Sequence, residues 1–403
     1  MKYLFIGYIY DQDAEKFLLK KNGHHLQPQN NQYAWGIING LNECTGANVD
    51  VIGSISCGSY PKNSQMLIVK RNFFVSSYGI DYVGFINFYD IREMCRYYGF
   101  LKKIRKYIKE TNDEITIIVD GMCHTFTKLI HRLKREYKDR IKIVLIVLDL
   151  VGKYAIQYPN KFQNWYYQRH AAEQMEAARL ADGYILLTEA MKGPLNIGNK
   201  PYTVIEGFLP KTEDDTDLPE IKRSKNKVVL YTGSLNKKFG LIDLLEQFVT
   251  IDDDSYELWI CGPQMGDIKI VEAYAKKDRR IKYLGFLPKS KILKLQRQAT
   301  VLVNPRSATD EFTKYSFPSK TMEYMLSGTP VVMYKLAGIP DEYDEYLNYF
   351  DVTSKACIKD KIVEICEMSL CERGMIGNRA RQFILTKSNK TQMKKFMDMM
   401  KLL

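Results

Sequence analysis

The sequence predicts an α/β protein built from two doubly wound domains, and three observations support this fold class. Its 403 residues correspond to about two domains of ordinary size. Short apolar runs alternate along the chain with longer segments of helical periodicity, which is the pattern of parallel sheets covered by helices. One such run, Val144–Leu148, is apolar at every position, as expected of a central strand buried on both faces.

The first domain is predicted to span residues 1–207. It opens with a strand at Lys2–Ile9, and the polar stretch from Asp11 to Gln32 is interpreted as a long loop with room for one short helix. Helices are expected at Tyr33–Leu41, Arg92–Glu110 and Asn164–Leu180. Further strands are predicted at Asn48–Ile52, Met66–Val69, Tyr82–Ile86, Ile115–Val119, Ile143–Leu148, Tyr184–Leu187 and Tyr202–Ile205.

The second domain, residues 208–387, begins with a linker that contains the acidic run Glu213–Asp215. Its strands are predicted at Lys227–Thr232, Tyr256–Ile260, Ile281–Leu287, Val301–Val303 and Val331–Met333. Its helices are predicted from Leu241, from Pro318 to Ser327, and at Lys359–Met368 and Arg373–Ile384. In the tail, Thr391–Leu403, an apolar stripe is formed by Met393, Phe396, Met397 and Met400.

Composition narrows the class of protein. The apolar run at the start is too short for a signal peptide or a spanning helix, so we expect a cytoplasmic location. The eight cysteines contain no Cys-x-x-Cys pair, which predicts neither a disulfide framework nor a zinc site. The adjacent His24 and His25 are not expected to share a metal. A net charge of +12 favours anionic partners, whether nucleotide phosphates, lipid phosphates, acidic membranes or nucleic acid.

The stretch that follows the strand Val301–Val303 carries the chemistry. A polar loop extends to Phe317, and Pro318 suits the first turn of a helix that Gly328 ends. Free N–H groups and the positive end of the helix dipole favour an anion at Ser319, Lys320 and Thr321. Glu323 lies about one turn inside, within reach of hydroxyls on the molecule that carries the anion. A phosphate beside a sugar hydroxyl describes a nucleotide sugar.

The motif Ser316-Phe317-Pro318-Ser319-Lys320, followed after the helix by Ser327-Gly328-Thr329-Pro330, resembles the donor site of retaining glycosyltransferases of the GT-B fold. Within that fold it is similar to the family 4-like enzymes of bacterial capsule and exopolysaccharide synthesis. The resemblance is close over about Val228–Pro340 and loose elsewhere. It implies two Rossmann-like domains that face each other across a cleft, with a last helix, residues 388–403, that returns to the first domain.

In that family two glutamates eight residues apart flank the donor loop. The second holds the ribose hydroxyls and matches Glu323, whereas the first matches Tyr315, which is not acidic, so that Glu311 becomes an alternative. A glycine loop, here Gly233–Gly240, carries an arginine and a lysine that touch the diphosphate. Ser234 takes the arginine position in this chain.

The cationic candidates of this loop are therefore Lys237 and Lys238, and Arg306 is placed to supply the missing charge. The turn Gly285-Phe286-Leu287 resembles the pocket for the nucleobase. The predicted donor site comprises Gly233, Ser234, Lys237, Lys238, Phe286, Leu287, Arg306, Tyr315, Ser316, Phe317, Ser319, Lys320, Thr321 and Glu323. No catalytic metal is expected, because the acidic run Asp252–Asp254 has the features of a solvated turn.

In the first domain Asp120, His124 and Asp149 each follow a strand, at the edge where ligands of doubly wound sheets bind. His124 is predicted to begin a helix and to face the cleft, the alternative being a surface histidine that caps the helix. His124, Asp149 and Lys238 are the catalytic candidates.

The segment Arg92–Glu110 has two interpretations. Tyr97, Leu101, Ile104 and Ile108 fall on one helical face, and lysines and arginines surround that face. Such a helix either packs in the core with its lysines in water or lies on an anionic membrane. The resemblance favours the membrane, since acceptors in that family are often lipid-linked.

Together with the resemblance, which implies retention and a glycan or lipid-linked glycan acceptor in surface polysaccharide synthesis, these observations predict a metal-independent transfer of a sugar from a nucleotide diphosphate donor, uridine-based. No cofactor and no nucleic acid partner are expected, and the location is the cytoplasm, peripherally on the inner membrane face. Two alternatives remain. One is a nucleotide-sugar 2-epimerase of the same fold, and the other is a non-catalytic partner subunit, which Tyr315 and Ser234 suggest.

Overall fold

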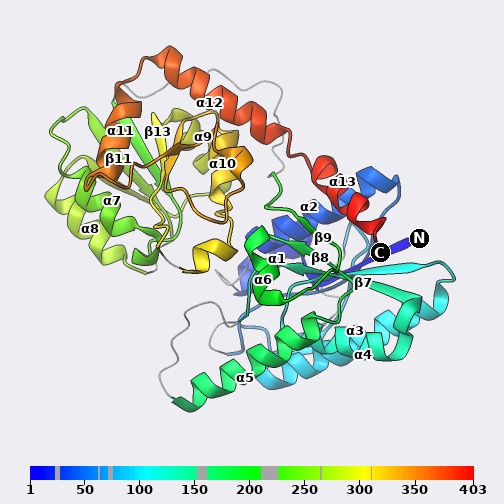
Figure 1. Cartoon of the computed structure of the whole chain (residues 1–403). Helices are drawn as coiled ribbons and strands as arrows, with labels where there is room; N and C mark the ends of the chain where they lie inside the picture. Colours follow the sequence, from blue (N-terminus) through cyan, green and yellow to red (C-terminus); the bar gives the residue numbers. More distant parts are fainter. Residues whose placement is uncertain are drawn as a thin grey trace. The chain divides into compact units, whose positions relative to one another are not determined.

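The computed structural model describes residues 1–22, 28–61, 64–70, 76–151, 161–209, 226–263, 266–309 and 311–403. The chain separates into two compact units, one made of Met1–Phe208 with Ser388–Leu403 and the other of Leu209–Lys387 (Figure 1). The predicted division between residues 207 and 208 differs from this one by a single residue. His24, His25 and the acidic linker run lie outside the described residues.

The first unit is built on a seven-stranded parallel sheet in the order β4-β2-β1-β6-β7-β8-β9. Its strands are β1 Lys2–Tyr8, β2 Asp50–Ser54, β4 Asp81–Tyr82, β6 Ile115–Asp120, β7 Ile141–Val147, β8 Gly183–Leu186 and β9 Tyr202–Val204. Its helices are α1 Gln12–Asn22, α2 Pro28–Thr45, α3 Tyr89–Glu110, α4 His124–Tyr137, α5 Lys161–Ala178, α6 Lys192–Leu195 and α13 Asn389–Met400. The strand order reverses direction between β1 and β6, which in doubly wound sheets opens a crevice at the carboxyl ends.

Two expectations for this unit were wrong. The stretch from Asp11 to Gln32 is mostly helical, because Asp11 accepts from the Ala14 N–H at 2.9 Å and so starts α1, while Pro28 begins α2. Ala14, Phe17 and Leu18 lie on one face of α1 and pack in the core, but the surrounding polar residues masked this short periodicity in the sequence. The predicted strand Tyr82–Ile86 divides into β4 and β5 (Phe85–Ile86), and β5 pairs antiparallel with β3 (Ile68–Val69) outside the main sheet.

Helix α13 belongs to the first unit and packs against α2. Gly40 makes the close approach possible, since a Cβ there would lie 2.5 Å from the Asn389 carbonyl oxygen and from Met393 Cγ. The buried residues of the tail are Met393, Phe396, Met399 and Met400, so Met399 replaces the predicted Met397 as a fully packed member. Met397 is only partly buried.

The second unit has a six-stranded parallel sheet in the order β12-β11-β10-β13-β14-β15. Its strands are β10 Lys227–Thr232, β11 Tyr256–Cys261, β12 Ile281–Gly285, β13 Val301–Asn304, β14 Val331–Met333 and β15 Asn348–Tyr349. Its helices are α7 Leu241–Phe248, α8 Ile268–Lys277, α9 Lys289–Gln298, α10 Lys320–Leu326, α11 Cys357–Glu367 and α12 Leu370–Leu385. The order reverses between β10 and β13, where a second crevice is expected. Among the described helices none is long and apolar enough to cross a membrane.

Candidate functional site

Two loops of the second unit meet at the carboxyl ends of β10 and β13. The loop after β10 ends at Gly240, which has a φ of +75°, and a Cβ on this residue would lie 1.8 Å from the Pro305 carbonyl oxygen. Only glycine therefore lets the two loops touch. The Arg306 guanidinium lies 5.8 Å from the centre of the Phe239 ring, across the same contact.

The loops after β11 and β12 join the same edge through their backbones. A Cβ on Gly262 would lie 2.2 Å from the Gly233 carbonyl oxygen, and the Gly262 N–H donates to the Gly285 carbonyl at 3.1 Å. The Tyr283 hydroxyl donates to the Gly262 carbonyl at 2.9 Å. The predicted base-pocket residues follow at once: Phe286 is 63% exposed and Leu287 is half-buried.

The backbone of the β10 loop is held in place, while the side chains of Ser234, Lys237 and Lys238 face solvent. The Tyr231 hydroxyl donates to the Ser234 carbonyl at 2.7 Å, and the Lys237 N–H donates to Asp267 Oδ2 at 2.6 Å. The Lys238 N–H donates to the Asn236 side chain at 3.0 Å. The N–H groups of Lys237 and Lys238 are thus occupied, but the exposed side chains of Ser234, Lys237 and Lys238 remain available to an anion.

The start of α10 only partly matches the predicted anion site. Ser319 is exposed and Lys320 is half-buried, as an anion site requires. The Thr321 N–H, however, donates to the Pro318 carbonyl at 2.8 Å, and the Thr321 side chain is buried with its hydroxyl 3.8 Å from Met333 Sδ. The prediction of a free N–H at Thr321 is therefore wrong, because the segment before the helix closes a turn.

Tyr324 anchors α10 to the end of β10. Its buried hydroxyl accepts from the Thr232 N–H at 2.8 Å and donates to the Thr232 carbonyl at 3.1 Å. Both partners come from the last residue of the strand, so the helix cannot slide along the sheet without breaking buried hydrogen bonds. No sequence pattern marks this contact, because a buried tyrosine in an apolar helix face resembles any core residue.

Glu323, on the same turn of α10, is the central acidic residue of the site. Its side chain is 12% exposed and accepts from Lys320 Nζ at 2.9 Å and from Gln296 Nε2 at 2.7 Å. Burial raises the pKa of this carboxyl, but Lys320, Gln296 and Lys289 outweigh burial and hold the pKa below its ordinary value. Glu323 is therefore ionised at neutral pH. Sequence reasoning missed Gln296 because α9 was not predicted.

The loop before α10 is a packed structure. Arg306 is buried, donates to Ser316 Oγ at 2.6 Å, and lies 4.6 Å above the Phe312 ring. Phe317 is buried against the Tyr343 ring at a centroid distance of 5.4 Å. These contacts give Arg306, Ser316 and Phe317 a role in shaping the loop. Tyr315 and Glu311 lie on the short 3₁₀ helix Glu311–Tyr315 within it.

The catalytic candidates His124 and Asp149 lie in the first unit, whereas Lys238 belongs to the second. His124 begins α4, as predicted, and its ring packs edge-on against His170 of α5 at 5.3 Å. A hollow of about 540 Å³ lies between these helices. Burial, Lys128 and His170 lower the pKa of His124 below its ordinary value, so the imidazole is neutral at pH 7. Asp149 is exposed just after β7.

Asp120 ends β6 and packs against β1, where a Cβ on Gly7 would lie 2.7 Å from Asp120 Cβ. Burial raises the pKa of Asp120 to about 7. No hydrogen bond to its carboxyl comes from any other residue that the structure describes. This carboxyl can therefore hold or release a proton near neutral pH.

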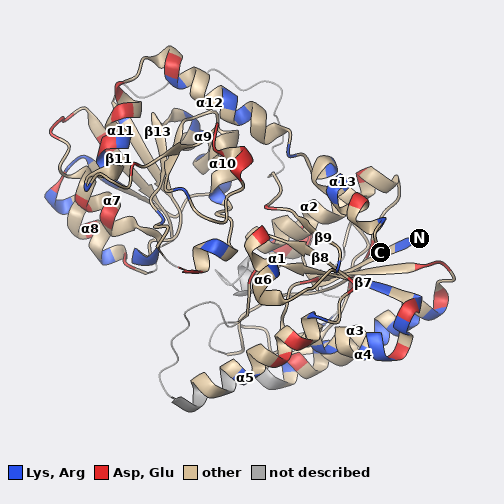
Figure 2. Cartoon of the chain, in the orientation of Figure 1, with Lys and Arg blue, Asp and Glu red and all other residues tan. Residues whose placement is uncertain are grey.

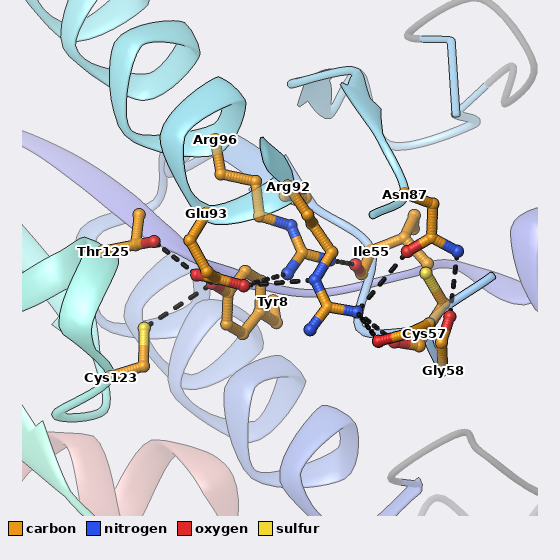
Figure 3. Close-up of polar contacts among 12 residues, drawn as sticks. Tyr8, Ile55, Cys57, Gly58, Asn87, Arg92, Glu93, Arg96, Cys123 and Thr125 are labelled. Atoms are coloured by element: carbon orange, nitrogen blue, oxygen red, sulfur yellow. Dashed lines mark hydrogen bonds and ion pairs between the residues drawn. The ribbon is translucent and has the colours of Figure 1, made fainter. Parts of the chain in front are cut away.

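A polar cluster occupies the carboxyl ends of β1 and β2 in the first unit (Figure 3). Glu93 of α3 accepts from Arg96 at 3.0 Å and Arg92 at 3.2 Å on Oε1, and from the Thr125 hydroxyl at 2.6 Å on Oε2. Arg96 also donates to the Ile55 carbonyl and lies 4.1 Å from the Phe85 ring centre. The cluster ties the start of α3 to the start of α4 and to the end of β2.

The structure decides between the two interpretations of the stripe on α3 in favour of core packing. Leu101, Ile104 and Ile108 are buried in the core of the unit, because α3 packs on the sheet through this face. The opposite face exposes Ile91, Met94 and Tyr98, spaced about one turn apart, and continues into Lys102 and Lys109. Ile68, Ile86 and Phe88, from β3, β5 and the residue before α3, are exposed as well. Figure 2 shows Lys and Arg residues along α3 and α4.

Across the parts of the chain that the structure describes, no group of three or more His, Cys, Asp or Glu side chains is arranged to hold a metal ion. The acidic run Asp252–Asp254 lies just before β11, at the edge of the sheet opposite to the loops above. Asp253 pairs with Lys227 at 3.2 Å and Asp254 with Arg279 at 2.8 Å, beside a hollow of about 950 Å³.

Comparisons with known proteins give a family match within the second unit and similar folds for the whole chain. Residues 226–367 match the family model of Glycosyl transferases group 1. A sucrose-phosphate synthase from Thermosynechococcus elongatus is similar at 15% identity over 100% of both chains, with a TM-score of 0.66. HepE from Anabaena, in complex with UDP, is similar at 13% identity over 100% of both chains, with a TM-score of 0.62. A search of curated proteins by sequence gave no match. The predicted GT-B fold of two Rossmann-like domains is thus confirmed.

Proposed function

We propose that this GT-B glycosyltransferase, whose residues 226–367 form a group 1 domain, moves a sugar from a nucleotide diphosphate donor to a hydroxyl of a glycan with retention at the anomeric carbon. The observation that carries the proposal is the ionised Glu323 beside the exposed start of α10 and the β10 loop. The solved complexes of Anabaena HepE with UDP and with UDP-glucose support a uridine-based donor.

The residues of the second unit have distinct roles in this proposal. The carboxylate of Glu323 accepts hydrogen bonds from the ribose hydroxyls, and Phe286 and Leu287 receive the base. As the bond between the anomeric carbon and the phosphate oxygen breaks, negative charge develops on the departing diphosphate. Ser319, Lys320, Lys237 and Lys238 are placed to stabilise that charge before the reaction begins, which is the usual basis of catalysis in such sites. No step in this scheme uses a metal or another cofactor.

The acceptor is proposed to be a glycan or lipid-linked glycan of a surface polysaccharide, reached from the cytoplasmic side of the membrane. Support comes from the exposed face of α3, where Ile91, Met94 and Tyr98 continue into Lys102 and Lys109. Apolar side chains beside lysines suit the boundary between the acyl chains and anionic headgroups. We assign membrane docking to this exposed face in place of the stripe Leu101, Ile104 and Ile108, because those three side chains are buried in the core.

Turnover separates the proposed transferase from its two alternatives. Purified protein is screened with UDP-sugars by thermal shift, because a ligand that binds only the folded state raises its melting temperature. Release of UDP that requires an acceptor supports transfer. Conversion of one free UDP-sugar into another without acceptor identifies an epimerase, and binding without either reaction identifies a non-catalytic subunit.

Membrane docking is tested separately with vesicles. The double variant Met94→Ser with Tyr98→Ser is expected to co-sediment less with anionic vesicles than the unchanged chain, and added salt should weaken both. Met375→Ser is the matched control, since Met375 is 56% exposed and Met94 is 55% exposed, but Met375 lies on α12 of the other unit. Equal loss in both variants, or equal binding to neutral vesicles, contradicts docking through α3.

A further inference from the structure

Gln296 is a buried polar residue at the site that the reaction described above leaves without a role. It lies on α9, and its side chain is fully buried. Its amide nitrogen lies 2.7 Å from Glu323 Oε1 and 3.5 Å from the Thr232 hydroxyl. Only the NH₂ end of the amide can donate to a carboxylate, so the contact with Glu323 sets the orientation of the group.

The two donors to Glu323 share one oxygen. Lys320 Nζ, at 2.9 Å, also contacts Oε1, whereas Oε2 accepts no hydrogen bond from any residue that the structure describes. Oε2 is also not among the buried polar atoms that lack a partner, so it reaches solvent. The carboxylate is therefore held at one oxygen and presents the other outward.

Gln296 is itself rigidly placed. Its main-chain carbonyl accepts from the Thr329 hydroxyl at 2.7 Å, which joins the end of α9 to the residues that follow α10. Its amide oxygen, in contrast, is buried and has no hydrogen-bond partner among the described residues. A buried acceptor without a partner is unfavourable, and an apolar side chain of this length would avoid that cost. The donor end of the amide is what distinguishes glutamine from such a side chain here.

We propose that Gln296 is a positioning residue for donor binding: it holds Glu323 through Oε1 so that Oε2 faces the ribose hydroxyls. The inference rests on the proposed function, because it assigns the ligand of Oε2. Lys320 shares the task, but its side chain lies on α10 itself and is 31% exposed. Gln296 supplies the contact from a second helix, so it fixes the direction of the carboxylate relative to the sheet.

Binding of UDP, measured by calorimetry as a function of pH, tests this role. Gln296→Met keeps the length and loses the donor, and we expect affinity for UDP to fall roughly tenfold at pH 7. The loss of a donor raises the pKa of Glu323, so the acidic limb of UDP binding should move to higher pH. The other ionisable groups around this carboxyl are Lys320, Lys289 and Tyr324, with Cys261 beside Lys320, and the variant leaves all four in place.

Gln392→Met is the matched control. Gln392 is also fully buried, and its amide oxygen has no hydrogen-bond partner among the described residues. It lies on α13, where its nitrogen is 3.5 Å from the Gly207 carbonyl. The Gln392→Met substitution should leave the affinity for UDP unchanged. If Gln296→Met does not fold, Gln296→Glu is measured instead. We expect this variant to bind UDP weakly at pH 7, and to bind it more tightly on acidification because the new carboxyl then gains an O–H donor.

The outcomes separate the two claims. If UDP binds neither the unchanged chain nor any variant, the proposed function fails. If UDP binds and Glu323→Gln weakens binding, but Gln296→Met changes neither the affinity nor the acidic limb, the role of Gln296 is overturned while the donor site stands. A shift of the acidic limb in Gln296→Met alone supports the positioning role, since a merely structural defect would lower affinity equally at every pH.

Discussion

Glu93 and Glu323 are both partly buried carboxylates at the carboxyl edge of a parallel sheet, yet their surroundings differ. Glu93 accepts on both oxygens, from Arg92, Arg96 and Thr125 and, at 3.5 Å, from Tyr8 (Figure 3). Glu323 accepts on one oxygen only. The pKa of each lies below its ordinary value for similar reasons: burial raises it, and cationic and hydrogen-bonding neighbours lower it further.

The difference teaches that a lowered pKa does not identify a binding residue. Structural ion-pair networks also shift the pKa of a carboxyl, as ligand sites do. What distinguishes the two residues is the remaining hydrogen-bonding capacity, which is filled at Glu93 and half-filled at Glu323. We therefore expect changes at Glu93 to affect the stability of the first unit, and changes at Glu323 to affect ligand affinity.

Glu93→Ala is expected to have the largest effect. Arg96 is 3% exposed and would lose its only described carboxylate partner, and removal of one member of a buried pair typically costs about 3–5 kcal/mol. The α3 amides should lose hydrogen-exchange protection, while UDP affinity of the remaining folded protein stays within about twofold. Glu93→Ala with full protection of α3 would contradict the structural role.

Glu323→Gln is expected to lower UDP affinity roughly tenfold or more without loss of stability, because charge-assisted hydrogen bonds each contribute about 1.5–3 kcal/mol. The 2′-deoxy form of UDP should lose much less from this substitution than UDP does, since one partner is already gone. The two ligands and two proteins make a double-mutant cycle. Simple additivity would show that Glu323 does not contact that hydroxyl.

Asp120→Asn extends the comparison to a carboxyl with no described partner. In the folded state the pKa of Asp120 is about 7, above its ordinary value of 3.8. Between pH 3.8 and pH 7 the folded state therefore keeps a proton that the unfolded state has already released. Stability should therefore fall as pH rises from about 4 to 7. Asn cannot ionise, and we expect it to stabilise the first unit by about 1 kcal/mol at pH 8 and by less at pH 5. Urea unfolding at both pH values measures this, and an equal effect at both contradicts it.

Tyr8→Phe is expected to have the smallest effect. The Tyr8 hydroxyl lies 3.5 Å from Glu93 Oε2, at the limit of hydrogen bonding, and Thr125 already contacts the same oxygen at 2.6 Å. The change in unfolding free energy should stay within about 0.5 kcal/mol. Thr125→Val, which removes the shorter bond, should cost more, and the reverse order would show that the network is organised around Tyr8.

The sequence was informative where the signal was local. Pro318, Gly328 and the intervening acidic residue lie within one loop and one helix, so their pattern predicted α10 and Glu323 together. The partners of this turn come from far along the chain: Gln296 is 27 positions from Glu323, and Thr232 is 92 positions from Tyr324. No local pattern marks such pairs. The same reason left two interpretations open at α3, where periodicity revealed an apolar face but not whether the core or a membrane covers it.

The return of α13 to the first unit has a consequence for the order of events during translation. The second unit is continuous in sequence and can complete its core as soon as Lys387 has left the ribosome. The first unit begins earlier but must wait, because Met393 and Phe396 belong to its core and α2 remains uncovered around Gly40 until α13 arrives. The part of the protein that is made first is therefore the part that finishes folding last, and chaperones would meet the exposed surface of α2 throughout synthesis of the second unit.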